Sequence, residues 1–281
     1  MIETPLSPVG QSDGSALHAL FGRSKVIIGV VHLAPLPGAP RHEGQSVEAI
    51  YQRGLADARA YLGGGIDGLI VENHGDVPFS KPDDIGPETS AHMAVAADRI
   101  RREFGKPIGI NVLANAAIPA LAIASAAAAG FIRVNQWANA YVANEGIVEG
   151  AAAKAMRYRA SLKANGVKIF ADAHVKHGAH AIVGDRPVEE QVRDLAFFDA
   201  DVIIATGQRT GHAADIEYIR MIKQASHLPT LVGSGVTTGN VNDILQVADG
   251  VIVASSLKVD GVWWNPVEPH RVRAFMAALR R

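Results

Sequence analysis

The sequence predicts a single (β/α)₈ barrel with a short N-terminal extension. Apolar, β-branched runs recur at intervals of roughly 25 to 40 residues, each followed by a polar loop and a helical pattern, which is typical of repeated βα units. Several units share one plan, in which a helix ends at Gly or Asp and the next strand starts at once, as in GGGIDGLIVEN and QVADGVIVASS. A chain of 281 residues with 48% hydrophobic residues can form one complete barrel.

Eight strands are expected. They are Lys25–His32, Asp67–Glu72, Pro107–Val112, Phe131–Asn135, Val167–His174, Asp201–Thr206, Thr230–Gly233 and Gly250–Ala254. Helical patterns lie between them at Ser46–Leu62, Ala91–Phe104, Ile118–Ala128, Glu145–Asn165, Val188–Phe198, Ala214–Ala225 and Val241–Val247. Residues 1–20 are expected to form an extension that folds as a short helix over the barrel floor, and residues 21–281 the barrel. A doubly wound open sheet is the alternative, but it would leave one of eight similar units at an edge.

The composition indicates which binding partners and which cellular compartment to expect. A formal net charge of -1, with no Lys/Arg run interleaved with aromatic residues, argues against nucleic acid. The absence of cysteine excludes disulfides, thiol nucleophiles and thiolate metal sites, and fits a reducing cytosol. The first residues do not resemble a secretory signal, and the alanine-rich run 116–129 is too short to span a bilayer. We therefore expect a cytoplasmic protein without a transmembrane segment.

Polar residues stand at the far ends of the predicted strands, where barrels of this kind carry their reacting groups. Because side chains alternate along a strand, those on one face converge on the barrel mouth. Buried charges are costly unless they pair with each other or with a ligand, so such a cluster marks a candidate site, although any single residue could serve only to satisfy a strand end. The predicted substrate-binding residues of this set are His32, Asn73, Asn111, Arg133, Asn135, Thr206 and, in the next loop, Thr210.

Two small-residue loops follow the seventh and eighth strands, which is where many barrels hold phosphate with backbone N–H groups. The predicted phosphate-binding residues are Gly233, Ser234, Gly235, Ser255, Ser256 and Lys258. Glycine permits close approach of the backbone to an anion. The alternative is a simple turn with a Ser/Thr helix cap.

The segment DAHVKH, at the end of the fifth strand, carries a carboxylate, two imidazoles and an amine within six residues. The predicted catalytic residues are Glu72, Asp172, His174 and Lys176. Three chemistries remain open: acid/base catalysis by the carboxylates and His174, a Schiff base on Lys176, or a divalent metal held by Asp172, His174 and Glu72. Acid/base catalysis is the leading interpretation, and no cofactor or metal is predicted.

Long loops at 33–45, 73–89, 178–187 and 207–215 have room to cover a ligand. Trp263 and Trp264 are interpreted as packing or interface residues rather than as a stacking surface.

Together, the motifs GVVHLAPLPGAP, DGLIVENHGDVPF, GINVLAN, FIRVNQW, ADAHVKH, ATGQRTG, VGSGVTTGNV and ADGVIVASSLKVDG resemble the BtpA/SgcQ family from about Lys25 to the end of the chain. The resemblance implies a phosphate-binding barrel of the ribulose-phosphate type. The family name derives from a role in photosystem I accumulation, and its other branch lies among bacterial sugar-utilisation genes. The positions in matching motifs include, besides the site residues above, Asp76, His177, Gly207 and Gly211.

The leading functional hypothesis is an enzyme for a small phosphorylated sugar or nucleotide-like compound, working as a lyase, an isomerase or a glycosyl-bond-cleaving enzyme. The alternatives are a non-catalytic assembly factor of the photosystem I biogenesis type and a phosphometabolite sensor. By analogy with other barrels, a homo-oligomer is expected.

Overall fold

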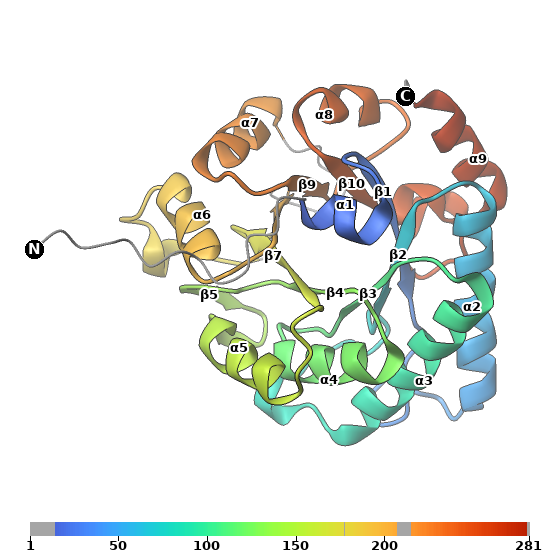
Figure 1. Ribbon diagram of the computed structural model, residues 1–281. Helices are drawn as coiled ribbons and strands as arrows, with labels where there is room; N and C mark the ends of the chain where they lie inside the picture. The colour runs from blue at the N-terminus through green and yellow to red at the C-terminus, as the bar shows by residue number, and fades with distance from the viewer. Residues whose placement is uncertain (1–14, 177, 207–214, 280–281) are drawn as a thin grey trace, which may run out of the picture.

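The computed structural model describes residues 15–176, 178–206 and 215–279. Eight parallel strands close into a barrel in the order β1-β10-β9-β8-β7-β4-β3-β2 (Figure 1). Closure gives each of these strands two partners, so the open doubly wound sheet is excluded. The barrel strands are β1 (Val26–His32), β2 (Gly68–Glu72), β3 (Ile108–Asn111), β4 (Phe131–Val134), β7 (Lys168–Ala173), β8 (Val202–Thr206), β9 (Thr230–Gly233) and β10 (Gly250–Val253). All eight predicted strands are confirmed to within a residue or two.

Helices form an outer ring around the strands (Figure 1). They are α2 (Val47–Gly63), α3 (Pro87–Phe104), α4 (Ala117–Ala127), α5 (Ala152–Ser161), α6 (Val188–Phe197), α7 (Ile216–Ala225), α8 (Val241–Val247) and α9 (Pro269–Ala278). Short 3₁₀ turns lie in the connections, at η1 (Pro82–Asp84), η2 (Ala181–Val183), η3 (Ser255–Leu257) and η4 (Val259–Gly261). In the described part of the chain, no helix combines the length and the apolar character needed to cross a membrane.

The apolar core has two layers because each strand buries both of its faces. Outward-facing residues such as Ile27, Val31 and Leu69 pack against the helices in the larger layer. Inward-facing residues such as Ile28, Phe131 and Phe170 fill the barrel interior. The interior is therefore a packed core that closes the barrel below the mouth.

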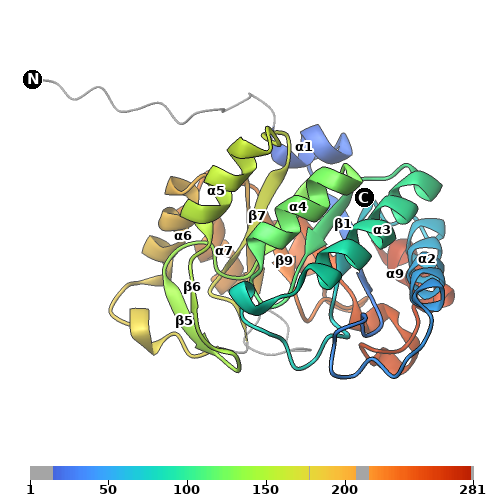
Figure 2. The ribbon, with the colours of Figure 1, turned by 90° about the horizontal axis from the view of Figure 1, so that it is seen from below.

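A short helix, α1 (Ala16–Phe21), lies over the amino-terminal end of the barrel, and residues 1–14 of the expected extension lie outside the described residues. Ser15 caps this helix by accepting a hydrogen bond from the His18 amide. Leu17 is fully buried and belongs to the same cluster as the interior residues Val26 and Phe131. Figure 2 shows α1 at one end of the barrel and the hairpin β5–β6 at the other.

That hairpin corrects the predicted helix Glu145–Asn165. Strands β5 (Ala140–Ala143) and β6 (Gly146–Glu149) pair antiparallel before α5 begins. The side chains of the hairpin alternate in burial, with Tyr141 and Val148 buried and Val142 and Ile147 exposed, and Gly146 adopts a positive φ of 99° at the turn. Tyr141 and Val148 pair across the hairpin and pack against Val175. The hairpin consequently forms one wall above the barrel mouth.

Candidate functional site

A cavity of about 850 Å³ opens at the carboxyl-terminal end of the barrel. It is bordered by the ends of β1 to β4, by the β5–β6 hairpin, and by the loops that follow β7, β9 and β10. Ten of the predicted site residues line it: His32, Glu72, Asn111, Arg133, Asn135, Lys176, Ser234, Gly235, Ser255 and Ser256. The structure therefore brings Glu72 and Lys176, two of the four predicted catalytic residues, and the two predicted phosphate loops to one cavity.

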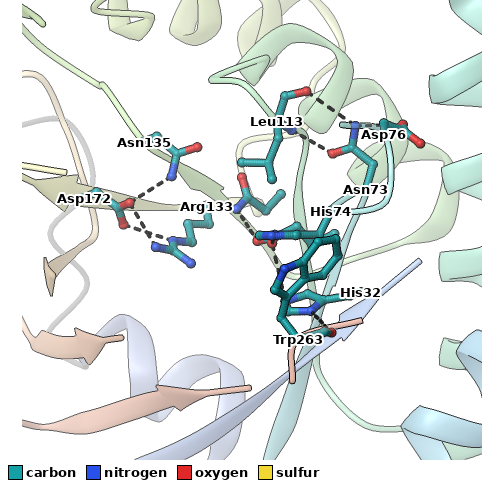
Figure 3. Close-up of polar contacts among 11 residues, drawn as sticks. His32, Asn73, His74, Asp76, Leu113, Arg133, Asn135, Asp172 and Trp263 are labelled. Atoms are coloured by element: carbon teal, nitrogen blue, oxygen red, sulfur yellow. Dashed lines mark hydrogen bonds and ion pairs between the residues drawn. The ribbon is translucent and has the colours of Figure 1, made fainter. Parts of the chain in front are cut away.

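Three of these side chains form a row because of strand register. His32 is paired with Glu72 between β1 and β2, and Glu72 is paired with Asn111 between β2 and β3. The Glu72 carboxylate accepts a hydrogen bond from Asn111 Nδ2 at 2.6 Å on Oε2, and from His74 Nδ1 at 2.8 Å on Oε1 (Figure 3). Burial acts to raise the pKa of Glu72, but the His74 hydrogen bond and the charges of His74, His32 and Arg133 outweigh it and lower that pKa. Glu72 is thus an ionised carboxylate.

His32 is buried beside it. Its Nδ1 lies 3.1 Å from the Trp263 carbonyl oxygen, and its Nε2 lies 3.6 Å from Glu72 Oε1. Burial lowers the pKa of His32 to about 3, against the opposing charge of Glu72, so the ring is neutral near pH 7. Because a carbonyl can only accept, Nδ1 carries the proton and Nε2 presents a lone pair toward Glu72.

A second buried carboxylate, Asp172, stands at the end of β7. Its two oxygens accept a bidentate pair of hydrogen bonds from Arg133, both at 3.0 Å, and a third from Asn135 Nδ2 at 2.9 Å (Figure 3). Burial opposes the charge of Arg133, but Asp172 and Glu72 raise the pKa of its guanidinium overall. Arg133 and Asn135 line the cavity and Asp172 does not. Asp172 therefore positions two cavity residues from behind.

Lys176 lines the cavity after the end of β7. Burial and the neighbouring Arg133 charge lower the pKa of its ammonium to about 8, although Glu72 and Asp172 act in the opposite direction. An amine with such a pKa exchanges protons near neutral pH, and it becomes an effective nucleophile or base once deprotonated.

The loop after β9 forms a tight turn at the edge of the cavity. Ser234 and Gly235 have positive φ angles of 95° and 67°. Asn240 braces the loop by donating to the Gly235 carbonyl at 2.8 Å and accepting from the Thr237 amide at 2.8 Å. Among the described residues, the Gly235 and Val236 amides have no acceptor. Ser256 joins the neighbouring loop to this one through its hydrogen bond to the Val236 carbonyl.

His174 does not face the cavity, which corrects the expectation that it would stand beside Asp172 and Lys176. Strand β7 ends at Ala173, and His174 has a φ of 52°, so the alternation of side chains breaks at this residue. Its ring packs edge-on against His180 with centroids 3.9 Å apart, and its Nδ1 lies 3.3 Å from the Tyr218 hydroxyl.

Asn73 and Thr206 are buried but lie outside the cavity lining. Asn73 bonds to Asp76 Oδ2 at 3.0 Å and accepts from the Leu113 amide at 2.8 Å, which ties two loops together (Figure 3). Asp76 in turn accepts from the Leu36 amide. Thr206 directs its hydroxyl to the His174 carbonyl at 3.4 Å. These contacts organise the mouth of the barrel.

Lys258 also has a different partner from the one expected. Only 1% of its surface is exposed, and its Nζ lies 3.5 Å from Asp57 Oδ2 on α2. A lysine held in a buried ion pair beneath the loop does not supply a free charge to the cavity. The predicted residue Thr210, with His177, Gly207 and Gly211, lies outside the described residues.

Several cavity residues were missed from the sequence. His74 lies within the motif DGLIVENHGDVPF, two residues after Glu72 and on the same side of the chain, but the sequence predicts no role for it. Trp263 and Trp264 line the cavity, and the Trp263 ring lies 4.3 Å from that of His74. The hairpin contributes Tyr141, Ala143, Asn144 and Glu145. No local pattern signals the tryptophans, because the loop after β10 brings them back over the β1 and β2 ends.

The structure also shows which potential metal ligands lie close to one another. The set considered from the sequence, Asp172 with His174 and Glu72, does not assemble, because Arg133 occupies Asp172 and His174 points elsewhere. His32, Glu72 and His74 do assemble, with one donor atom from each within 4.8 Å of the others.

The closed ring of eight parallel strands with its outer helices is a TIM barrel. It resembles the structure of thiamine phosphate pyrophosphorylase from Pyrococcus furiosus, with a TM-score of 0.55 and 14% identity over 91% of this chain and 95% of that chain. The family model of the BtpA family matches residues 23–281, and the chain belongs to that family.

Two relatives show how widely the sequence is shared. An uncharacterized protein of Archaeoglobus fulgidus is 42% identical over 91% of this chain and 99% of its own length. Photosystem I biogenesis protein BtpA of Synechocystis is 38% identical over 94% of this chain and 91% of its own length.

Proposed function

We propose that the protein is an enzyme for a small phosphorylated metabolite, of the phosphosugar or nucleotide-like class. The observation that carries the proposal is that one cavity is lined both by the loops after β9 and β10 and by Glu72 and Lys176. A substrate whose phosphate lies at Gly235 and Ser255 would extend its reacting end toward those two groups.

The backbone of the loop after β9 supports the proposal that this part of the cavity binds the phosphate group. Positive φ angles at Ser234 and Gly235 give this loop a turn conformation, and successive amides in a turn can converge on an anion. Because Val236 and Gly235 have no acceptor within the described chain, their N–H groups are available to a phosphate oxygen. Such a local site explains how a protein with almost no net charge selects an anion.

The middle of the cavity suits a substrate rich in hydroxyl groups. Asn111 Oδ1 and Asn135 Oδ1 are buried without a partner among the described residues, while the amide nitrogens of both residues are already used. Leaving a buried acceptor unpaired costs about 1 to 3 kcal/mol. Hydroxyl hydrogens of a sugar would satisfy both oxygens.

Acid/base chemistry fits the reacting end best. Lys176, with a pKa of about 8, can give up or take a proton near neutral pH, and the ionised Glu72 carboxylate stabilises positive charge that develops on the substrate. Proton transfer is common to lyase, isomerase and glycosyl-bond-cleaving reactions, and a nearby carboxylate suits the cation-like transition state of the last of them. The deprotonated amine of Lys176 also permits a Schiff base with a carbonyl substrate.

The name of the Synechocystis relative, a photosystem I biogenesis protein, favours a second candidate, in which the barrel assists assembly without turnover. A phosphometabolite sensor would share the cavity. A cytoplasmic homo-oligomer remains our expectation for the enzyme, and the cysteine-free sequence fits a reducing compartment.

The first test is calorimetry of the full-length chain with inorganic phosphate and with sugar phosphates. We expect saturable binding and a raised Tm, which Gly235→Val and Ser255→Asp both weaken, the first by blocking the approach of the anion to the loop and the second by charge repulsion. Gly239→Ala, in the same loop without a positive φ, serves as the control. Absence of phosphate binding would remove the basis of the proposal.

The second test is a turnover screen of phosphorylated metabolites. Product formation that Lys176→Met abolishes supports the enzyme. Binding without any product would favour the sensor, and neither binding nor product would favour the assembly factor.

A further inference from the structure

We propose that His32, Glu72 and His74 form a binding site for one divalent transition-metal ion of the zinc type. One donor atom from each residue lies within 4.8 Å of the others, and all three residues line the cavity. This inference shares the cavity with the proposed function but does not depend on the phosphate loops.

His32 is already oriented as a ligand. Its Nδ1 donates to the Trp263 carbonyl at 3.1 Å, so its Nε2 lone pair faces the cluster. Nε2 lies 3.6 Å from Glu72 Oε1, which is too long for a hydrogen bond, and it has no other acceptor or donor in the described chain. A backbone carbonyl behind the second ring nitrogen is the usual way in which proteins fix a metal-binding histidine.

Glu72 is held in the same fashion. Asn111 Nδ2 binds Oε2 at 2.6 Å, which leaves Oε1 as the oxygen that faces both imidazoles. Only about 6% of the Glu72 side chain is exposed. A buried carboxylate that is anchored through one oxygen and directed through the other has the arrangement of a monodentate ligand.

His74 completes the set from the end of the same strand. Its Nδ1 lies 2.8 Å from Glu72 Oε1, and an ion between these atoms would take the place of that shared proton. Its ring is fixed by Trp263 at 4.3 Å, by His32 at 4.5 Å in a stacked arrangement, and by Phe79 at 5.8 Å. These ring contacts keep His74 at the cavity wall in Figure 3.

The donor types select the ion. Two imidazole nitrogens and one carboxylate oxygen suit Zn²⁺ and its neighbours, whereas Mg²⁺ and Ca²⁺ prefer oxygen ligands alone. Three protein ligands leave at least one coordination position open, and here it faces the cavity. An ion in this position would polarise a substrate oxygen or a bound water, with Glu72 acting as its ligand and Lys176 remaining as the proton-transfer group.

The test uses the full-length chain after chelator treatment, without phosphate. Zn²⁺ retained after gel filtration is measured by elemental analysis, and Co²⁺ is titrated as a spectroscopic probe. We expect one ion per chain and a Co²⁺ visible spectrum typical of nitrogen and oxygen ligands. His32→Ala, Glu72→Gln and His74→Ala should each weaken binding at least about tenfold. His92→Ala is the matched control, because His92 lies outside the cavity and bonds to Tyr51.

Thermal melts establish that each variant is folded, and His74→Gln replaces His74→Ala if the latter is not. Less than stoichiometric binding by the wild type, or unchanged affinity in folded ligand variants, would overturn the proposal. Loss of phosphate binding in Gly235→Val with Zn²⁺ binding retained would separate the two sites. The converse result, phosphate binding without Zn²⁺ binding, would leave the phosphometabolite proposal standing alone.

Discussion

Two buried carboxylates lie at strand ends near the cavity in different surroundings, Glu72 on β2 and Asp172 on β7. Both oxygens of Asp172 accept hydrogen bonds from the guanidinium of Arg133, one of them also accepts from Asn135, and Asp172 does not line the cavity. Glu72 bonds to an amide and an imidazole, and it does line the cavity. Two residues that are equivalent acid/base candidates in the sequence therefore differ in their hydrogen bonds and in their access to the cavity.

The two carboxylates differ in their hydrogen-bond partners. A bidentate arginine saturates a carboxylate and shields it, so Asp172 contributes by holding Arg133 and Asn135 in place. Glu72 instead contacts two imidazoles and an asparagine, and one of its oxygens remains directed toward a substrate or an ion. We therefore propose that chemistry takes place on the β2 side of the cavity and that the β7 side positions its residues, with Lys176 as the reactive group contributed from beyond β7.

The largest expected effect follows from replacing the carboxylate that faces the cavity. Glu72→Gln should lower kcat/KM on the metabolite found by the screen by about 10²- to 10⁴-fold, because the amide keeps the shape and loses the charge. The control is Glu268→Gln, which alters an exposed ion pair with Arg271. Wild-type turnover in Glu72→Gln would refute the division of roles.

The second effect concerns the free energy of unfolding. Asp172→Ala should lower it by about 3 to 5 kcal/mol, because Arg133 then remains buried without its bidentate partner. The double variant Arg133→Met with Asp172→Leu should recover most of that loss in urea titrations, since neither charge is then buried alone. If Asp172→Ala were as stable as the wild type, Asp172 would not hold the positioning role assigned to it.

The third effect is a pH dependence of stability. The pKa of Lys176 is lowered to about 8 in the folded chain, while an unfolded lysine has a pKa of about 10.4. Between these values the unfolded state binds more protons, so stability should rise with pH relative to Lys176→Met, by at most about 1.4 kcal/mol per pH unit. Below pH 8 both states are protonated and the two curves should run parallel.

Urea titrations of both proteins between roughly pH 7 and pH 10 measure the difference. Lys154→Met, in which an exposed lysine is replaced, is the control. A flat difference for Lys176→Met would mean that the amine has an ordinary pKa and is a weak candidate for proton transfer.

The barrel and most of its rim could be predicted because strand periodicity and the position of a residue at a strand end are local properties. Glu72 and Arg133 were placed correctly in this way. His174 was not, because a single residue with a φ of 52° reverses the side-chain direction and nothing in the sequence marks it. Lys258 and Trp263 depend on long-range contacts, with Asp57 and His32 respectively. The cluster of His32, Glu72 and His74 depends on the register between β1 and β2, which pairs His32 with Glu72, and periodicity alone does not fix that register.

The smallest effect tests the two asparagines that hold the carboxylates. Among the residues that the structure describes, the Oδ1 atoms of Asn111 and Asn135 have no hydrogen-bond partner, and both side chains line the cavity. If Asn111 Oδ1 accepts a substrate hydroxyl, Asn111→Ala should weaken binding of a sugar phosphate by about 1 kcal/mol, or roughly fivefold, and leave inorganic phosphate unaffected. Calorimetry with both ligands measures the difference, and Asn242→Ala, which removes a bond between α8 and the Ala278 carbonyl, is the control. Equal losses for the two ligands would show instead that Asn111 acts on the shape of the cavity, through its hold on Glu72, and that its oxygen contributes no recognition of the sugar.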